Sequence, residues 1–130
     1  MESTKPEDLA PELRAFLYSC IDAVEQVEIL MLLRRSEKVW TSRAVTTELS
    51  LSEAVTRRHL EVLTARGLLH VQAESEVSYQ FGPRTAELSR YAGLLAEHYA
   101  RDRGAVLRFV STSSRRTKSF ADAFKLRDSE

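Results

Sequence analysis

The apolar positions in the first third of the chain predict two helices. A short helix over residues 12–19 carries its apolar side chains on one side. A second helix runs from about Asp22 to Arg35, and Asp22 stands three residues before Glu25, a spacing close to that of a capping box. Apolar residues cover more than one face of the second helix, which predicts a place at the centre of the core for Val24, Val27, Ile29, Leu30, Met31 and Leu33.

Two further helices, separated by a turn, are expected next. A short strand around Val39–Thr41 leads to Ser42, which is expected to cap a helix over residues 43–49. The turn SLS ends at Ser52, which is expected to cap a helix over residues 53–65. Serine favours both positions because its hydroxyl accepts a hydrogen bond from a backbone N–H that the first helical turn leaves free.

A β-hairpin and one long helix complete the pattern. Gly67 is expected to end the preceding helix in the left-handed conformation. The segments LLHVQA and VSYQF are rich in β-formers and are separated by the short polar ESE, which predicts a hairpin that ends at Gly82–Pro83. Apolar residues then recur at spacings of three, four and seven, which predicts a long helix over residues 84–110, although Asp102 interrupts its stripe and Gly104 weakens it.

The stretch TSRAVTTELSLSEAVTRRHLEVLTARGLL resembles the winged helix-turn-helix domains of bacterial transcriptional regulators, above all the MarR, ArsR and PadR types. The resemblance covers residues 20–83 and rests on the spacing of caps, turn, buried aliphatics and exit into the wing, at Ser42, Val45, Leu49, Leu51, Ser52, Leu60, Leu63 and Gly67 to Leu69. It implies a mainly α fold with a small β-hairpin wing, here followed by a long C-terminal helix, and sequence-specific DNA binding through the third helix of the unit.

Two residues depart from this family pattern. Thr46 stands in place of the small alanine usual in the second helix of the unit, and Thr56 replaces the usual buried valine in the third. Neither forbids the fold, because a threonine hydroxyl can donate back to a carbonyl of the preceding turn.

The pattern and the resemblance together divide the chain into four parts. These are a lead-in with a short helix (1–19), the winged helix-turn-helix (20–83), the long helix (84–110) and a basic linker with a short aromatic segment (111–130).

A helical projection of residues 53–65 separates a core side from a DNA side. The core side is expected to hold Val55, Thr56, His59, Leu60, Val62 and Leu63, with His59 at its boundary. The opposite side presents the residues that would enter the major groove and read bases, namely Glu53, Ala54, Arg57, Arg58 and Glu61, with Thr64.

The two adjacent arginines are the principal base readers, because arginine pairs with guanine O6 and N7. Glu61 either accepts from cytosine N4 or pairs with Arg57 or Arg58. Alternatively, the arginines belong to an ordinary solvated helix face. Phosphate contacts are predicted for Ser52, Arg43 and Thr64.

The wing lacks the basic tip that the resemblance implies. Glu74 and Glu76 flank Ser75 at its tip, and His70 is the only nearby group that could become positive. Carboxylates are repelled by DNA phosphates, to an extent that depends on salt. The wing is therefore expected to stand clear of the duplex or to contact a protein instead.

Charge is balanced over the chain but unevenly distributed. Lys and Arg number 19 and Asp and Glu also 19, so there is no general attraction to nucleic acid. Six basic residues and one acidic residue, Asp102, fall within residues 101–118, which places any footprint for a polyanion late in the chain.

The long helix and the tail each allow more than one interpretation. The helix either folds back as a core helix or forms a homodimer seam through Leu88, Tyr91, Leu95 and Tyr99; dimerisation would double the bases contacted. The tail is a solvated end, a basic arm through Arg115, Arg116 and Lys118, or a docking helix for a protein partner through Phe120 and Phe124.

Several other functions are not supported by the sequence. His59, His70 and His98 lack metal-ligand spacing, and there is neither a glycine-rich phosphate loop nor a recognisable catalytic constellation, so we expect no metal, no cofactor and no enzymatic activity. The lone Cys20 fits a reducing cytoplasm, and neither a secretion signal nor a membrane span is expected. The sequence thus predicts a cytoplasmic regulator that binds double-stranded DNA, with a winged-helix protein-interaction module, using the acidic wing or the aromatic tail, as the alternative.

Overall fold

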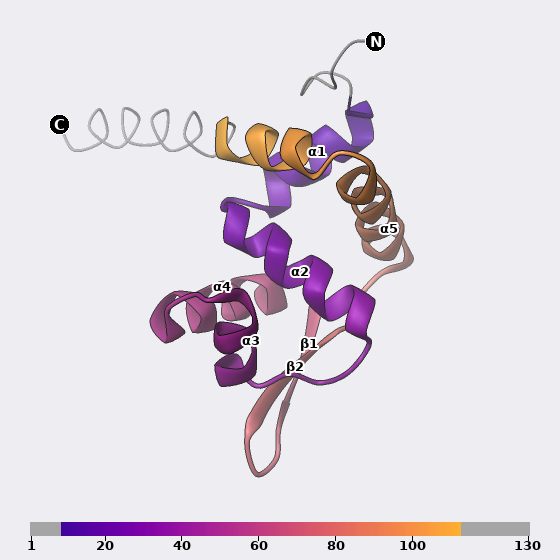
Figure 1. Ribbon diagram of the computed structural model, residues 1–130. Helices are drawn as coiled ribbons and strands as arrows, with labels where there is room; N and C mark the ends of the chain where they lie inside the picture. Colours follow the sequence, from indigo (N-terminus) through magenta and orange to yellow (C-terminus); the bar gives the residue numbers. More distant parts are fainter. Residues whose placement is uncertain (1–8, 113–130) are drawn as a thin grey trace, which may run out of the picture.

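The computed structural model describes residues 9–112, which fold into two layers (Figure 1). Helix α1 (Pro11–Cys20), helix α5 (Ala86–Arg101) and a helical segment over residues 103–112 form one layer. The other layer holds the helices α3 and α4 and a β-hairpin that points away from α1 and α5, and α2 (Val24–Ser36) runs between the two. The predicted fold, mainly α with a β-hairpin wing, is confirmed.

Helix α2 is the centre of the core, as its apolar pattern predicts. Its buried residues lie on all sides and include Val27, Ile29, Leu30 and Leu33, each fully buried. The predicted capping box at its start is wrong, because the N-cap is Ala23 and no side chain caps it. The backbone N–H of Asp22 instead donates to the Oε1 atom of Gln26 at 2.9 Å.

Helices α3 (Ser42–Leu49) and α4 (Glu53–Ala65) form the helix-turn-helix. The cap of α3 is one residue earlier than predicted, since the hydroxyl of Thr41, not Ser42, accepts from the N–H of Ala44 at 3.1 Å. The cap of α4 is the predicted one.

The two threonines that depart from the family pattern have different surroundings. Thr56 is fully buried and its hydroxyl donates to the carbonyl of Ser52 at 2.9 Å, as expected. The buried Oγ1 atom of Thr46 has no hydrogen-bond partner among the described residues, so the expected bond to the preceding turn is absent there.

The exit of α4 turns the chain into the wing, the hairpin of β1 (Leu69–Ala73) and β2 (Val77–Phe81). Gly67 adopts a positive φ of 84°. Its N–H donates to the carbonyl of Thr64, and the N–H of Leu68 donates to that of Leu63, each at 3.0 Å. These two bonds form a Schellman motif, which confirms the predicted glycine terminus.

The connector before α3 joins the hairpin through one residue. Trp40 exchanges two backbone hydrogen bonds of 2.7 Å with Tyr79, the middle residue of β2. The predicted strand around Val39–Thr41 is therefore a single bridge that fixes the base of the wing against the helix-turn-helix.

The helix predicted over residues 84–110 is two helical segments. Thr85 caps α5, which ends at Arg101. Asp102 then leaves the helical conformation, with φ −154° and ψ 84°, and its carboxylate accepts from the N–H of Ala105 at 3.1 Å. Asp102 thus caps the segment 103–112, because a short acceptor side chain stabilises a new helical start better than it continues an old helix. The prediction of one continuous helix is wrong.

Candidate nucleic-acid interface

The start of α4 is fixed by its Ser52 cap, and its core side is buried. The hydroxyl of Ser52 accepts from the N–H of Val55 at 3.2 Å, while Thr56, Leu60 and Leu63 are fully buried. Val55, which the helical projection placed on the core side, is instead 39% exposed. The first turn of α4 projects beyond the core, so its side chains are open to solvent on more sides than the projection predicts.

The opposite side of α4 faces solvent. All five predicted base readers on this reader face are exposed: Glu53, Ala54, Arg57, Arg58 and Glu61. An Nη2 atom of Arg57 lies 3.2 Å from a carboxylate oxygen of Glu53, one turn earlier. Glu61, which the sequence offered as an ion-pair partner of the arginines, forms no ion pair with either of them. Arg58 makes no hydrogen bond or ion pair with residues 9–112.

A groove of about 400 Å³ lies between the helix-turn-helix and the wing. Its lining combines two guanidinium groups and three carboxylates with the start of α3 and two apolar residues of the wing. The lining residues are Thr41, Ser42, Arg43, Glu53, Arg57, Glu61, Glu76, Val77 and Tyr79. The structure thus brings the predicted phosphate contact Arg43 next to the reader face, and it adds Glu76 from the wing tip, whose charge opposes a phosphate.

The other two predicted phosphate contacts lie apart from each other. Ser52 is exposed at the start of α4. Thr64 is half-buried near the end of the same helix, where its hydroxyl donates to the carbonyl of Leu60 at 2.8 Å. Ser52 therefore belongs to the end of α4 that carries most of the reader face, and Thr64 does not.

Tyr79 forms one wall of the groove, a role that was missed in the sequence. It is 5% exposed, and its pKa is raised chiefly by burial and further by the nearby Glu61, while Arg57 opposes the shift. The alternation of VSYQF places Tyr79 on the same hairpin face as Leu69, opposite Val71, and this alternation could have revealed its burial.

The wing changes character from base to tip. On one face of the hairpin Leu69 and Tyr79 are buried, whereas Val71, the cross-strand partner of Tyr79, is 40% exposed and Val77, nearer the tip, is 48% exposed. Glu74 and Glu76 at the tip are exposed. The outer half of the wing is therefore an apolar face bordered by two carboxylates.

The residues predicted as a dimer seam mostly pack inside the chain. Leu95 is fully buried, and the ring of Tyr91 stacks on Phe16 of α1 with 5.4 Å between centroids. Leu88 and Tyr99 are half-buried at the edge of the core. The aromatic tail residues Phe120 and Phe124 and the basic residues 115–118 lie outside the described residues.

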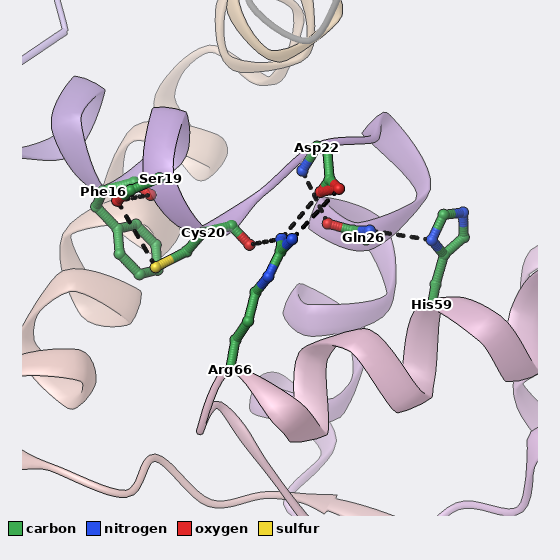
Figure 2. A network of polar contacts seen from close by, with 7 residues as sticks. All are labelled: Phe16, Ser19, Cys20, Asp22, Gln26, His59 and Arg66. Atoms are coloured by element: carbon green, nitrogen blue, oxygen red, sulfur yellow. Dashed lines mark hydrogen bonds and ion pairs between the residues drawn. The ribbon is translucent and has the colours of Figure 1, made fainter. Parts of the chain in front are cut away.

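A network of polar contacts holds the back of α4 against the junction of α1 and α2 (Figure 2). His59, the predicted boundary histidine, is half-buried, and its Nδ1 atom lies 3.1 Å from Nε2 of Gln26. Arg66, just after α4, donates to the carbonyl of Cys20 and to the carboxylate of Asp22. The contact between Gln26 and His59 joins residues 33 positions apart, so no local sequence pattern predicts it.

Within residues 9–112, no group of three or more histidine, cysteine or acidic side chains is arranged to hold a metal ion. Among the same residues, no helix is long and apolar enough to cross a membrane.

These features together define a MarR-like winged helix-turn-helix fold with an exposed reader face. The structure of the adhesin competence repressor AdcR from Streptococcus pyogenes superposes with a TM-score of 0.51 at 17% identity, over 95% of this chain and 92% of that chain. ZitR of Lactococcus lactis in complex with DNA superposes with a TM-score of 0.49 at 20% identity, over 80% of this chain and 73% of that chain. No model of a protein family and no curated protein matches the sequence.

Proposed function

We propose that this protein is a transcriptional regulator that binds double-stranded DNA in a sequence-specific manner through the reader face of α4. The observation that carries the proposal is the exposure of Arg57 and Arg58 on the side of α4 opposite its buried residues Leu60 and Leu63. A helix of this kind fits the major groove, where arginine recognises guanine. The function is occupancy of a site on cytoplasmic DNA, with no chemical step.

Arg58 is the leading base reader, because its guanidinium makes no bond with the described residues and can turn to a base without losing a partner. Arg57 must first exchange its contact with Glu53, an exposed ion pair of the kind that stabilises by only about 0.5 kcal/mol. The gain from a bidentate contact with guanine, about 1–3 kcal/mol, exceeds that cost.

The DNA backbone would pass the start of α4 and the start of α3. Arg43 and Ser52 are both exposed there and can approach phosphates. The carboxylates of Glu61 and Glu76 line the neighbouring groove and oppose a close approach on the wing side. We therefore infer that the two helices supply most of the contact and that the wing supplies little.

We further propose that the protein acts as a homodimer, since a single reader helix contacts few base pairs and two-fold symmetry doubles the site. The seam would lie on the layer of α1, α5 and residues 103–112. Leu95 has no exposed surface to offer, so a partner copy would rest on half-buried apolar residues near the predicted seam, among them Leu94, Leu107 and Phe109. Mass in solution at micromolar concentration tests this, and a monomer would contradict it.

The DNA proposal is tested by selection from random duplexes at moderate salt, followed by binding titrations with the enriched sequence. The double variant Arg57→Ala with Arg58→Ala should lose at least about a hundredfold in affinity, because two arginine–guanine contacts disappear. A matched control removes two exposed basic residues at and just after the end of α2, Arg35→Ala with Lys38→Ala, which lie outside the groove, the reader face and the proposed seam, and makes the same change in net charge.

The control should bind within about threefold of the wild type, and both variants should keep its oligomeric state and melting temperature. Equal losses in the two variants would mean that only net charge matters, and sequence-specific reading by α4 would be rejected. If wild type enriches no sequence and shows no salt-dependent retention, the DNA function itself is rejected.

One observation favours a second function, binding of a protein partner through the wing. The exposed Val71 and Val77 lie on one face beside the acidic tip, and neither contributes to the core. A basic and apolar partner segment would fit this face. If no duplex is enriched, Val77→Lys tests this alternative, because a lysine there should abolish capture of such a partner, while deletion of residues 111–130 tests the tail in the same assay.

A further inference from the structure

We propose that Gln26 and His59 position the reader helix for DNA binding, and that their hydrogen bond forms only while His59 is neutral, so that protonation of His59 weakens DNA binding. This inference rests on the proposed function of α4. It assigns a role to the back of the helix, whereas the base readers lie on its front. Figure 2 shows Gln26 between Asp22 and His59, with Arg66 reaching the same loop from the end of α4.

The orientation of the Gln26 amide is set by its surroundings. Gln26 is only 2% exposed, and its Oε1 atom accepts from the backbone N–H of Asp22 at 2.9 Å. Because the oxygen is held on that side, the Nε2 amide group must face His59, where it lies 3.1 Å from Nδ1. An amide nitrogen only donates, so Nδ1 of His59 must accept, and its proton must be on Nε2.

A second contact ties α4 to the same loop. Arg66 donates to both carboxylate oxygens of Asp22, at 2.9 and 3.3 Å, and to the carbonyl of Cys20 at the end of α1. Asp22 thus serves both contacts, with its backbone N–H on Gln26 and its carboxylate on Arg66. These polar contacts hold the back of α4 at His59 and just beyond its end, in addition to the burial of Leu60 and Leu63, and Arg58 is the residue before His59.

Protonation of His59 removes one of the two contacts. The imidazolium carries a hydrogen on Nδ1, which would point at the amide hydrogens of Gln26, and two donors cannot bond. Burial is the main reason why the pKa of His59 lies below the usual 6.5. Of the charged groups around the ring, Glu25 and Asp22 on the α2 side favour the cation, while Arg58 on its own helix opposes it.

The same shift makes the fold itself sensitive to pH. Because the pKa is lower in the folded state than in the unfolded chain, the neutral form contributes its full stability above about pH 6.5. That contribution is lost as pH falls from there through the folded-state pKa. Protonation of His59 therefore lowers the stability of the fold even without DNA.

The test compares wild type with His59→Asn, in which an amide oxygen can replace Nδ1 as the acceptor but cannot be protonated near neutral pH. Binding to the selected duplex is titrated at about pH 7.5 and at a pH below the midpoint that the NMR titration of His59 gives, at constant ionic strength. Relative to His59→Asn, the wild type should lose about fivefold more affinity on acidification, as expected for one lost hydrogen bond. The matched control is His70→Asn, an exposed histidine of β1 outside the network, which should behave like the wild type.

A second measurement needs no DNA. The imidazole signals of His59 are followed by NMR through a pH titration of the full chain, together with the amides of α4. His59 should titrate below pH 6.5, and the amides around Arg58 should shift with the same midpoint in wild type but not in His59→Asn.

The outcomes separate the two proposals. Equal pH dependence in wild type and His59→Asn, or α4 amides that do not respond to the His59 titration, would overturn the positioning role. Failure of every form to bind a duplex at pH 7.5 would reject the DNA function, and the NMR titration would still decide whether the Gln26 contact holds the helix.

Discussion

Helix α4, the proposed reader helix, and the wing lie side by side in the same fold, but their exposed surfaces differ in charge. Helix α4 exposes Arg57 and Arg58 on the side opposite its buried leucines. The wing has the expected hairpin geometry, yet its tip carries Glu74 and Glu76 and its outer face carries exposed valines. One element therefore combines the shape and the charge of a DNA-binding surface, and the other has the shape alone.

The difference shows that spacing and surface chemistry carry separate information. The spacing of caps, glycine and buried aliphatics is a requirement of packing, and it holds wherever the chain folds in this way. The charges at exposed positions are not required by packing, so they indicate which molecules the surface can bind. In this protein the residue spacing and the surface charge both favour DNA binding at α4, whereas at the wing the spacing favours it and the charge does not.

The first prediction concerns the stability of the junction between the two elements. Gly67 has a φ of 84°, and an added Cβ would lie 3.3 Å from both the Cβ of Arg84 and the Cδ1 of Leu88. We predict that Gly67→Ala lowers the free energy of unfolding by about 2 kcal/mol, because a left-handed alanine is strained and the contacts are tight. Chemical denaturation measures the change.

Gly93→Ala is the matched control for this substitution. Gly93 lies inside α5, and the nearest atom to an added Cβ is a terminal nitrogen of Arg34 at 3.5 Å, an ordinary contact. The control should raise stability by about 0.5–1 kcal/mol, since alanine favours a helix interior. Destabilisation of similar size at both positions would contradict the role given to the Gly67 turn.

The next prediction reverses the charge of the wing. Glu74→Lys with Glu76→Lys should strengthen DNA binding about tenfold at low salt and make its salt dependence steeper by about two, because each lysine near a phosphate releases a counterion. Titrations over a range of salt concentrations measure both effects. The strengthening should be the same for the selected sequence and for an unrelated duplex, since phosphate contacts do not read bases.

A charge reversal far from the wing shows whether position matters. Glu97→Lys on α5 makes the same change as Glu76→Lys alone and removes no bond with the described residues. If Glu76→Lys strengthens binding no more than Glu97→Lys does, the wing stands clear of the duplex, and the acidic tip is irrelevant to DNA.

The elements of this fold could be predicted from the sequence because short-range rules determine them. The Ser52 cap, the Gly67 turn and the alternation of the hairpin each involve residues a few positions apart. The errors arose where two local signals compete. Asp102 interrupts the apolar stripe, which the sequence alone shows. Whether the helix continues through Asp102 or a new one begins there depends on the bond that its carboxylate accepts from the N–H of Ala105.

The long-range part of the candidate site could not be predicted in this way. The bond between Gln26 and His59 joins residues 33 positions apart, and the groove combines α3, α4 and β2. Such contacts depend on how the helices cross, which single-sequence periodicity does not determine. The hydroxyl of Thr46, which has no partner among residues 9–112, is a further case, since only the packing around α3 decides whether its O–H finds an acceptor.

The smallest expected effect concerns the ion pair on the reader face itself. Glu53→Gln removes the carboxylate that lies 3.2 Å from Arg57 and leaves an amide of similar size. We predict about twofold tighter binding to the selected duplex, because Arg57 no longer has to leave a charged partner and one negative charge is removed from the DNA side. Loss of an acidic residue from the first turn of α4 should lower stability by about 0.5 kcal/mol.

Glu48→Gln, an exposed position on the neighbouring helix α3, makes the same charge change outside the groove and is the control. Binding titrations of both variants against the same duplex decide the question. If Glu53→Gln and Glu48→Gln tighten binding equally, the ion pair does not restrain Arg57, and the reader face is limited only by overall charge. If Glu53→Gln weakens binding, Glu53 contacts the DNA itself, and the division of the reader face into contacting arginines and a restraining carboxylate must be revised.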